Sequence, residues 1–186
     1  VLGEVATRAC GATGARVEHR RQLGGTAVLW RALRAGSIDA YAAQIDEALT
    51  RLQSATGLAP VLVCHSMGGL AARAWLRAYA ADARVAHIVT IGTPHHGTWL
   101  ARHSKARNGR QMRLQSAWLQ ELAAVESPAR RAKFTCWYSN CDNIVFPAST
   151  ATLPGAENCH LPAAGHMQLA FEPRVMSASL AKIASV

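Results

Sequence analysis

The sequence predicts an α/β fold with a mostly parallel sheet flanked by helices. Three short apolar runs, at 61–64, 85–91 and 134–138, are rich in β-branched or aromatic residues. Segments whose apolar residues recur at helical spacing separate these runs. Strands that alternate with helices in this way form βαβ units, whose strands are parallel.

The 186 residues are enough for one domain, and a hydrophobic content of 50% is enough to build a core. We expect a poorly defined segment at 1–36, because arginines interrupt every apolar run there except a possible short strand at 27–30. The α/β core is expected at 37–186. Because the chain begins with valine rather than methionine, we expect a fragment or a processed product.

The first expected helix spans 38–52, where apolar residues recur on one face opposite charged ones. Ser37 is its expected N-cap, and Gly57 ends it. Pro60 then opens the first strand, at 61–64.

After this strand the pattern is helical from Met67 to about residue 81, and the second strand follows at 85–91. Segment 100–111 is polar and basic, which predicts a loop or a mobile flap. A further helix is expected over 115–124, and Pro128 stops it.

The third strand, at 134–138, is followed by a loop, and a short extended piece is expected at 157–161. Pro173 opens a terminal helix. Its inward-facing residues are expected to be Val175, Met176, Leu180 and Ile183.

A serine lies at the corner between the first strand and the helix that follows it. Ser66 comes directly after the strand, and Gly68 and Gly69 permit a sharp turn into the helix. This pattern predicts a nucleophile elbow, in which a strained backbone projects the serine Oγ beyond the strand. The backbone N–H of Met67 is then expected to bind a developing oxyanion.

A serine hydroxyl needs a base to take its proton and a carboxylate to orient that base. Asp142 follows the third strand, and His166 follows the last extended piece. Because the carboxyl ends of parallel strands meet at one edge of a sheet, we expect Ser66, Asp142 and His166 to meet there. Asp82 and Glu157 are alternative acids, and His160 is the alternative base, with His95 and His96 at the same edge.

Four blocks in order resemble the bacterial lipase/esterase branch of the α/β-hydrolase superfamily. They are Val63–Leu70 around the serine, Gly92-Thr93-Pro94-His95-His96-Gly97-Thr98, Tyr138-Ser139 through Asp142 to Val145 and Pro147, and Gly165-His166. The resemblance covers roughly residues 37–186 and implies an α/β-hydrolase fold whose early strands are missing or atypical.

The resemblance also implies hydrolysis of triacylglycerols or simpler carboxylic esters through an acyl-enzyme. Ser66 would be the nucleophile, His166 the base and then the acid, and Asp142 the orienting partner. No metal or organic cofactor would be needed. The alternative is a catalytically silent α/β-hydrolase-like domain with a binding or membrane-associated role.

Two departures from this pattern concern the serine and its surroundings. Cys64 stands two residues before the serine, where the pattern usually has glycine, and it is small enough for that crowded position. The second oxyanion donor usually lies in a His-Gly loop upstream, which the chain lacks, so that donor is not identified. Gly24-Gly25 is a possible substitute, and a surface turn is the alternative.

Segment 100–133 is expected either to act as a lid or flap over the site or to pack as an ordinary helix with a basic face. Residues that could contact a substrate lie beside the serine and in or directly before this segment. The candidates are His65, which we expect to point away from the Ser66 Oγ, and the possible acyl-pocket residues Trp99, Met112, Leu114 and Trp118.

The formal net charge of +9 favours attraction to a lipid–water interface, with a solvated basic surface as the alternative. The motifs of nucleic-acid-binding modules are missing, so no nucleic-acid partner is expected. No transmembrane segment or signal peptide is evident, and any export or membrane signal is expected upstream of Val1. Cys141 and Cys159 are expected either to form a disulfide or to be free thiols.

Overall fold

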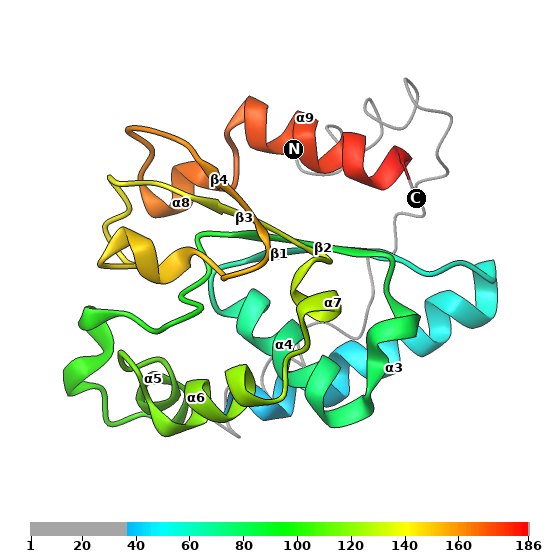
Figure 1. Ribbon diagram of the computed structural model, residues 1–186, viewed down its shortest axis with the longest axis horizontal. Coiled ribbons are helices and arrows are strands. Elements are labelled where there is room, and N and C mark those ends of the chain that lie inside the picture. Colours follow the sequence, from blue (N-terminus) through cyan, green and yellow to red (C-terminus); the bar gives the residue numbers. More distant parts are fainter. Residues whose placement is uncertain (1–36, 186) are drawn as a thin grey trace.

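The computed structural model describes residues 37–185, and in that range four parallel strands form one sheet. The strand order is β1-β2-β3-β4, and the strands span Val61–His65, His87–Ile91, Phe134–Tyr138 and Glu157–His160. Helices lie on both sides of this sheet (Figure 1). The predicted α/β class with a parallel sheet is therefore confirmed. The expectations for 27–30 and Gly24-Gly25 lie outside the described residues.

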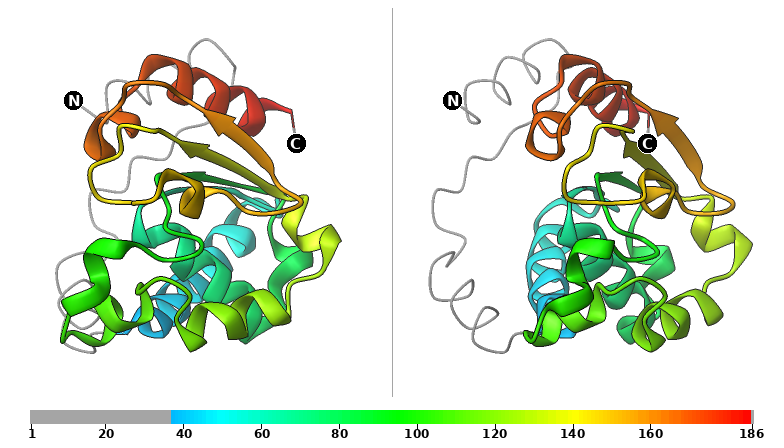
Figure 2. Two further views of the ribbon diagram at one scale, coloured as in Figure 1. Left: turned by 60° about the vertical axis from the view of Figure 1, so that its left-hand side comes forward. Right: turned by 90° about the vertical axis from the view of Figure 1, so that its left-hand side faces the viewer.

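The longer helices lie in two layers, one on each side of the sheet. In Figures 1 and 2, α3, α4, α6 and α7 lie on one side, and α9 lies on the other. The α-helices are α3 (Ile38–Thr56), α4 (Met67–Tyr79), α5 (Arg107–Gln111), α6 (Ala117–Ala124), α7 (Pro128–Arg131), α8 (His166–Leu169) and α9 (Pro173–Ala184). Three 3-10 turns are η1 (Ala81–Arg84), η2 (Trp99–His103) and η3 (Ala148–Ala151).

The central strand β2 is buried on both faces and separates two apolar clusters. Ile88 belongs to the larger cluster, which also contains residues of α3, α4 and α6. Val89, the next residue, belongs to a smaller cluster with Leu169 of α8 and Val175 of α9. Successive side chains of a strand point to opposite faces, so a central parallel strand needs apolar residues at consecutive positions.

The strand register brings the carboxyl ends of all four strands to one edge. Cys64, Thr90, Cys136 and Asn158 lie side by side across the sheet. The segments that follow β1, β2, β3 and β4 therefore leave from the same edge. These segments carry the residues that the sequence singles out.

Several local signals act as predicted. Gly57 ends α3 in the left-handed conformation, with φ 70°, and its N–H bonds to the Gln53 carbonyl at 2.8 Å. Pro173 opens α9, whose buried residues are Val175 and Ser179. The inward orientation expected for Ile183 is wrong, because it is 38% exposed and the buried residues of α9 lie in its first two turns.

Segment 100–111, expected to be a loop or a mobile flap, contains most of η2 and all of α5. Polar contacts hold these short turns: Arg113 donates to the Ser104 carbonyl at 2.9 Å, and the Thr98 N–H donates to the Met112 carbonyl at 2.8 Å. No apolar period marks such turns, which explains why the sequence pattern missed them. In the next helix, α6, Leu119 and Leu122 are buried in the larger cluster.

Cys141 and Cys159, expected either to form a disulfide or to be free thiols, are free thiols. Cys159 lies inside β4, opposite Trp137, and Cys141 is exposed in the loop after β3. A disulfide between them is therefore not formed in this structure. None of the helices within 37–185 is long and apolar enough to cross a membrane.

Candidate active site

Ser66 lies at the corner between β1 and α4, where the chain turns without a connecting loop. Its backbone has φ 55° and ψ −128°, and positive φ is uncommon for a non-glycine residue. The Ser66 N–H bonds to the Ile91 carbonyl, at the end of β2, at 2.9 Å. Met67 opens α4, and the first N–H groups of a helix have no acceptor within that helix.

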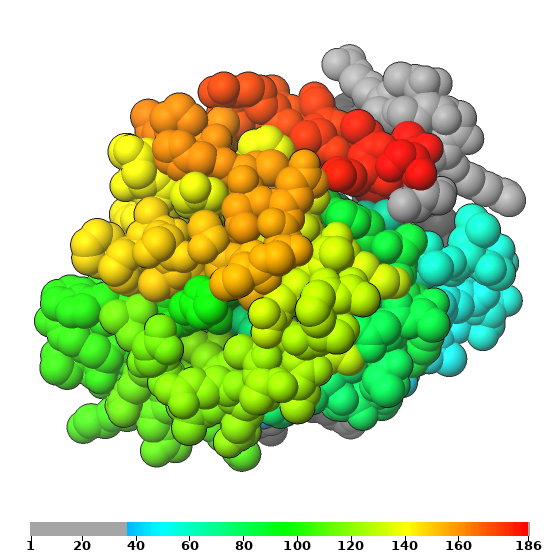
Figure 3. All heavy atoms as spheres, viewed as in Figure 1, coloured from blue at the N-terminus to red at the C-terminus, as the bar shows by residue number. Residues whose placement is uncertain are grey.

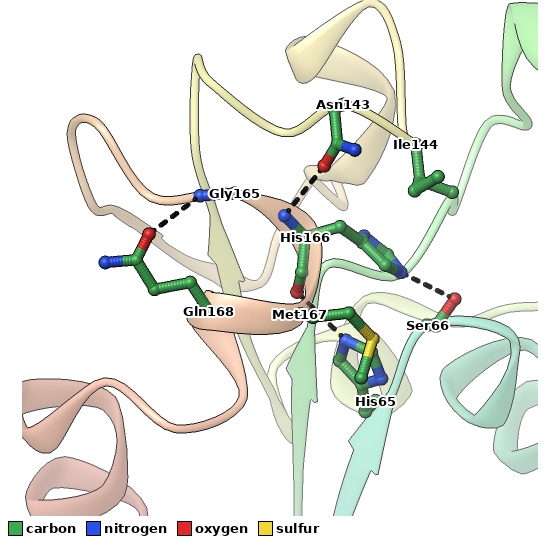
Figure 4. Close-up of a pocket in the computed structure, with 8 residues that line it drawn as sticks. All are labelled: His65, Ser66, Asn143, Ile144, Gly165, His166, Met167 and Gln168. Atoms are coloured by element: carbon green, nitrogen blue, oxygen red, sulfur yellow. Dashed lines mark hydrogen bonds between the residues drawn. The ribbon is translucent and has the colours of Figure 1, made fainter.

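His166 is the first residue of α8, and its side chain reaches Ser66. The His166 Nε2 lies 3.0 Å from the Ser66 Oγ (Figure 4). Two neighbours hold its backbone: its N–H donates to the Asn143 Oδ1 at 3.2 Å, and its carbonyl lies 3.1 Å from the His65 Nε2. Hydrogen bonds at both the N–H and the carbonyl of His166 therefore fix the backbone that carries its imidazole ring.

Asp142 lies on the other side of the His166 ring. Its Oδ2 is 2.9 Å from the His166 Nδ1, and its Oδ1 accepts the N–H groups of Ile144 and Val145, each at 2.8 Å. Burial by itself raises the pKa of Asp142, but the hydrogen bonds from His166, Val145 and Ile144 outweigh it and hold the pKa below its ordinary value. The carboxyl group is therefore ionised at neutral pH.

Serine, imidazole and carboxylate thus form one hydrogen-bonded series. In such a series the imidazole can take the hydroxyl proton while the carboxylate stabilises the resulting imidazolium. The three residues follow β1, β3 and β4, so the parallel sheet brings them together across about 100 residues of sequence, as the separation of Ser66 and His166 shows.

The alternative acids and bases are engaged elsewhere. Asp82 forms two 2.6 Å hydrogen bonds with Arg130, and Glu157 bonds with Thr135 and Lys182. His160, at the end of β4, lies against the Tyr138 ring. His95 is buried, and burial, with Arg73 and His96 nearby, lowers its pKa well below the ordinary value. None of these contacts involves Ser66.

A pocket of about 630 Å³ opens beside Ser66 and His166 (Figure 4). His65 lies in its wall, and Ile144 and Met167 are 42% and 62% exposed there. Apolar groups beside the serine suit the acyl or alkyl part of a substrate. The expected contact of His65 with a substrate stays a prediction.

The two tryptophans expected to contact the substrate lie elsewhere. The Trp118 Nε1 donates to both carboxylate oxygens of Asp39 at 3.2 Å, because α6 packs against the helical layer and not at the strand ends. Trp99 is half-exposed, and the Arg102 guanidinium covers its ring. Neither is among the residues that line this pocket, and their contact with a substrate stays a prediction.

The two residues directly before segment 100–133, the expected lid or flap, are joined to the loop after β3. The Thr98 hydroxyl donates to the Ile144 carbonyl at 2.6 Å, and the Trp99 N–H donates to the Phe146 carbonyl at 2.8 Å. Figure 3 shows the green surface near residue 100 beside the yellow surface of that loop. Movement of this segment as a flap stays a prediction.

Cys64 fits the position where the family pattern has glycine. A side chain at Gly68 would lie 3.8 Å from the Cys64 Cβ, which is ordinary contact. Burial raises the pKa of the Cys64 thiol to about 12, so this thiol is uncharged at neutral pH. It is therefore not a competing nucleophile beside Ser66.

Three residues that shape the site were not assigned a role from the sequence: Asn143, Gly92 and Thr93. Asn143 bonds to the His166 backbone, Gly92 lies against His166 and Asp142, and the Thr93 hydroxyl donates to the Ser66 carbonyl. The available signal was a Gly-Thr-Pro sequence directly after a strand. Among the described residues, no group of three or more His, Cys, Asp or Glu side chains is arranged to hold a metal ion.

The fold resembles that of solved lipases. The chain superposes on the mature lipase BlEst2 of Bacillus licheniformis with a TM-score of 0.65 and 18% identity, covering 77% of this chain and 74% of that one. For lipase B of Aspergillus fumigatus the TM-score is 0.67 at 19% identity, covering 77% of this chain and 41% of that one. At such identities the likeness shows the fold alone.

The chain thus has the α/β-hydrolase fold, and it spans about two fifths of the Aspergillus lipase. A sequence search of curated proteins finds no match. The sequence profile of the PGAP1-like alpha/beta domain matches residues 40–152, which include Ser66 and Asp142. Because this match spans more than half of the 186 residues, the chain belongs to the family of PGAP1-like alpha/beta domains.

Proposed function

We propose that the protein is a serine carboxylic-ester hydrolase that acts through Ser66, His166 and Asp142. The observation that carries the proposal is the series of hydrogen bonds from the Ser66 Oγ through the His166 ring to Asp142, at 3.0 Å and 2.9 Å, beside an open pocket. The lipase-like fold supports the same reaction class.

In the proposed reaction, the Ser66 Oγ attacks the ester carbonyl carbon while the His166 Nε2 takes the hydroxyl proton. The carbonyl oxygen becomes an oxyanion, to which the Met67 N–H donates. Collapse of the tetrahedral intermediate expels the alcohol, which takes its proton from His166. A water molecule, deprotonated by His166, then attacks the acyl carbon, the bond from this carbon to the Ser66 Oγ breaks, His166 returns the proton to that oxygen, and the carboxylic acid leaves.

The second oxyanion donor is not identified among the described residues. Loss of one such donor costs about 10²–10³ in rate, so its presence decides how active the chain is. Gly24-Gly25 lies outside the described residues, as does any donor from 1–36.

Covalent labelling by a fluorophosphonate probe tests the nucleophile directly. We expect labelling of the wild-type chain and its loss in Ser66→Ala, since the probe phosphonylates an activated serine. We also expect loss of hydrolysis in His166→Ala but not in His160→Ala, whose ring contacts Tyr138 rather than Ser66. If the full-length protein is not labelled, the chain is a catalytically silent α/β-hydrolase-like domain.

The finer proposal concerns the substrate. The exposed Ile144 and Met167 at the pocket suit an apolar acyl chain, and the net charge of +9 suits a lipid–water interface. We expect activity on nitrophenyl esters to rise with acyl length and to increase further on emulsified substrate. Equal activity on short, monomeric esters would identify an esterase instead of a lipase.

A further inference from the structure

The peptide unit between Ser66 and Met67 is the part of the site that most needs support from outside. Ser66 has φ 55° and ψ −128°, a conformation that persists only where the surroundings over-determine it. The same unit carries the Met67 N–H, the proposed oxyanion donor. Whatever holds this peptide unit therefore also determines where that N–H points.

The end of β2 supplies the support on both sides of Ser66. The Ser66 N–H bonds to the Ile91 carbonyl at 2.9 Å, and the Ser66 carbonyl accepts the Thr93 hydroxyl at 2.8 Å. A second bond to this carbonyl, from the Gly69 N–H, is longer, at 3.3 Å. Thr93 is 1% exposed, so water does not compete for its hydroxyl.

A peptide bond is planar and trans, and its C=O and N–H groups point in opposite directions. A hydrogen bond that holds the Ser66 carbonyl therefore also orients the Met67 N–H. We propose that Thr93 is a positioning residue that aims the Met67 N–H at the oxyanion. This inference rests on the proposed function, because it assigns a role in the same reaction.

Gly69 makes the contact possible. A Cβ at Gly69 would lie 2.7 Å from the Thr93 Cγ2 and 2.9 Å from the Thr90 Cγ2, and it would also overlap the Thr93 Oγ1. A helical glycine is unfavourable in itself, so its absent side chain has a use here. It lets the first turn of α4 approach the end of β2 closely enough for Thr93 to reach Ser66.

The test compares Thr93→Val, which removes the hydroxyl and keeps the shape, with Thr93→Ser, which keeps the hydroxyl. On a soluble nitrophenyl ester, we expect Thr93→Val to lower kcat by about 10- to 100-fold, because a misdirected Met67 N–H costs no more than the loss of one oxyanion donor. We expect KM to stay within about threefold of the wild-type value. Thr93→Ser should restore most of kcat. Affinity for an alkyl boronic acid, which forms a tetrahedral anionic adduct with the serine, should fall in parallel with kcat/KM in Thr93→Val.

Thr90→Val is the matched control, because Thr90 is equally buried and its hydroxyl lies 3.0 Å from the His95 Nε2 rather than at the Ser66 carbonyl. We expect its kcat to stay within about threefold of wild type, since it leaves the oxyanion donor in place. The pH dependence of kcat/KM should be the same in Thr93→Val and wild type, because His166 and Asp142 are untouched.

Three results would overturn the inference: a folded Thr93→Val with kcat near wild type, equal losses in Thr93→Val and Thr93→Ser, or an equal loss in Thr90→Val. If Thr93→Val does not fold, Gly69→Ala provides the second variant, since its methyl displaces the Thr93 hydroxyl. A Gly69→Ala protein that folds with wild-type kcat would also overturn it. If the wild type itself is not labelled by fluorophosphonate, the proposed function fails first.

Discussion

Gly92 lies at the end of β2 beside both partners of Ser66. Its φ of +57° is a conformation that L side chains rarely adopt. A Cβ at this position would lie 3.1 Å from the His166 Nδ1 and 3.2 Å from the Asp142 Oδ2. The absence of a side chain at Gly92 therefore allows the turn after β2 and leaves room for the His166 ring and the Asp142 carboxylate.

We expect Gly92→Ala to destabilise the fold by about 1–2 kcal/mol through the positive φ. We also expect kcat/KM to fall at least tenfold, because small displacements of reacting groups cost up to about 10² in rate. Gly57→Ala is the control, since Gly57 has φ +70° and nothing lies within 4 Å of the added Cβ. Equal hydrolysis rates in the two folded variants would contradict this reading.

Asp142 gives the site a defined dependence on pH. Its pKa is lower in the folded protein than in the unfolded chain, so the folded state holds the proton less tightly. The carboxylate therefore contributes stability above the unfolded pKa of about 3.9, and that contribution is lost as pH falls through the folded pKa.

Asp142→Asn is expected to unfold more readily than wild type at pH 6–7. The difference in the free energy of unfolding should shrink as the pH falls below about 4, because the unfolded wild-type chain then binds a proton at Asp142 that the folded state binds less tightly. Urea denaturation of both proteins across this range measures the difference. A gap that stays constant down to pH 3 would show that the charge on Asp142 is not its source.

At the scale of elements, a buried ion pair links α4 to the segment after α6. The Arg73 guanidinium forms two bonds to Glu126, at 2.6 Å and 2.9 Å, and a third to the His95 carbonyl at 2.9 Å. Both charged side chains are almost fully buried. The pair therefore ties the helix that begins at the elbow to the turn after β2 from which Thr93 comes.

Removal of one partner leaves a buried, uncompensated charge. We expect Arg73→Met or Glu126→Leu to cost about 3–5 kcal/mol, and the double variant Arg73→Met/Glu126→Leu to cost much less than the sum. Urea denaturation of the four proteins of this cycle measures the coupling. The exposed pair Glu47–Arg51 is the control, with an expected cost of about 0–1 kcal/mol. Additive costs at Arg73 and Glu126 would contradict the coupling.

Over the whole molecule, the sheet separates two cores with different relations to the site. Leu122 of α6 and Leu169 of α8 are both fully buried, on opposite faces of the sheet. α8 also begins with His166, so packing around Leu169 holds the element that presents the imidazole. The larger cluster takes its α-helical residues from α3, α4 and α6, and His166 belongs to none of these helices.

Leu122→Ala and Leu169→Ala are each expected to cost about 2–5 kcal/mol, because each leaves a cavity in a packed core. At a temperature where both variants are folded, we expect Leu169→Ala to lose more kcat than Leu122→Ala. Thermal unfolding and ester hydrolysis on the same samples make the comparison. Equal kcat values in the two variants would show that α8 keeps His166 in place without this packing.

Much of the fold and of the candidate site was predictable from local patterns. The strand 134–138 is found where predicted, and Gly57 and Pro173 act at the helix ends as their backbone preferences require. Ser66, Asp142 and His166 were named from their places after strands, and the structure brings them within hydrogen-bonding distance. Their roles stay proposals.

Other features had no local signal. The helices of segment 99–111 depend on polar contacts such as that of Arg113 with the Ser104 carbonyl, which no hydrophobic period marks. The hydrogen bond from the Trp118 side chain to Asp39, which is 79 residues away, had no local signal either. Such assignments depend on which distant element lies opposite, and the sequence pattern does not contain that information.

The sequence by itself determined the parallel α/β architecture, the sharp turn at Ser66 and the chain order of serine, carboxylate and imidazole, because these follow from short-range backbone preferences and from strand–helix alternation. The tertiary structure alone decided the free state of Cys141 and Cys159, the place of Ile144 and Met167 at the pocket, and the contact of Thr93 with the Ser66 carbonyl. Those depend on strand register and on how closely α4 approaches β2, which are set by packing between segments far apart in the chain.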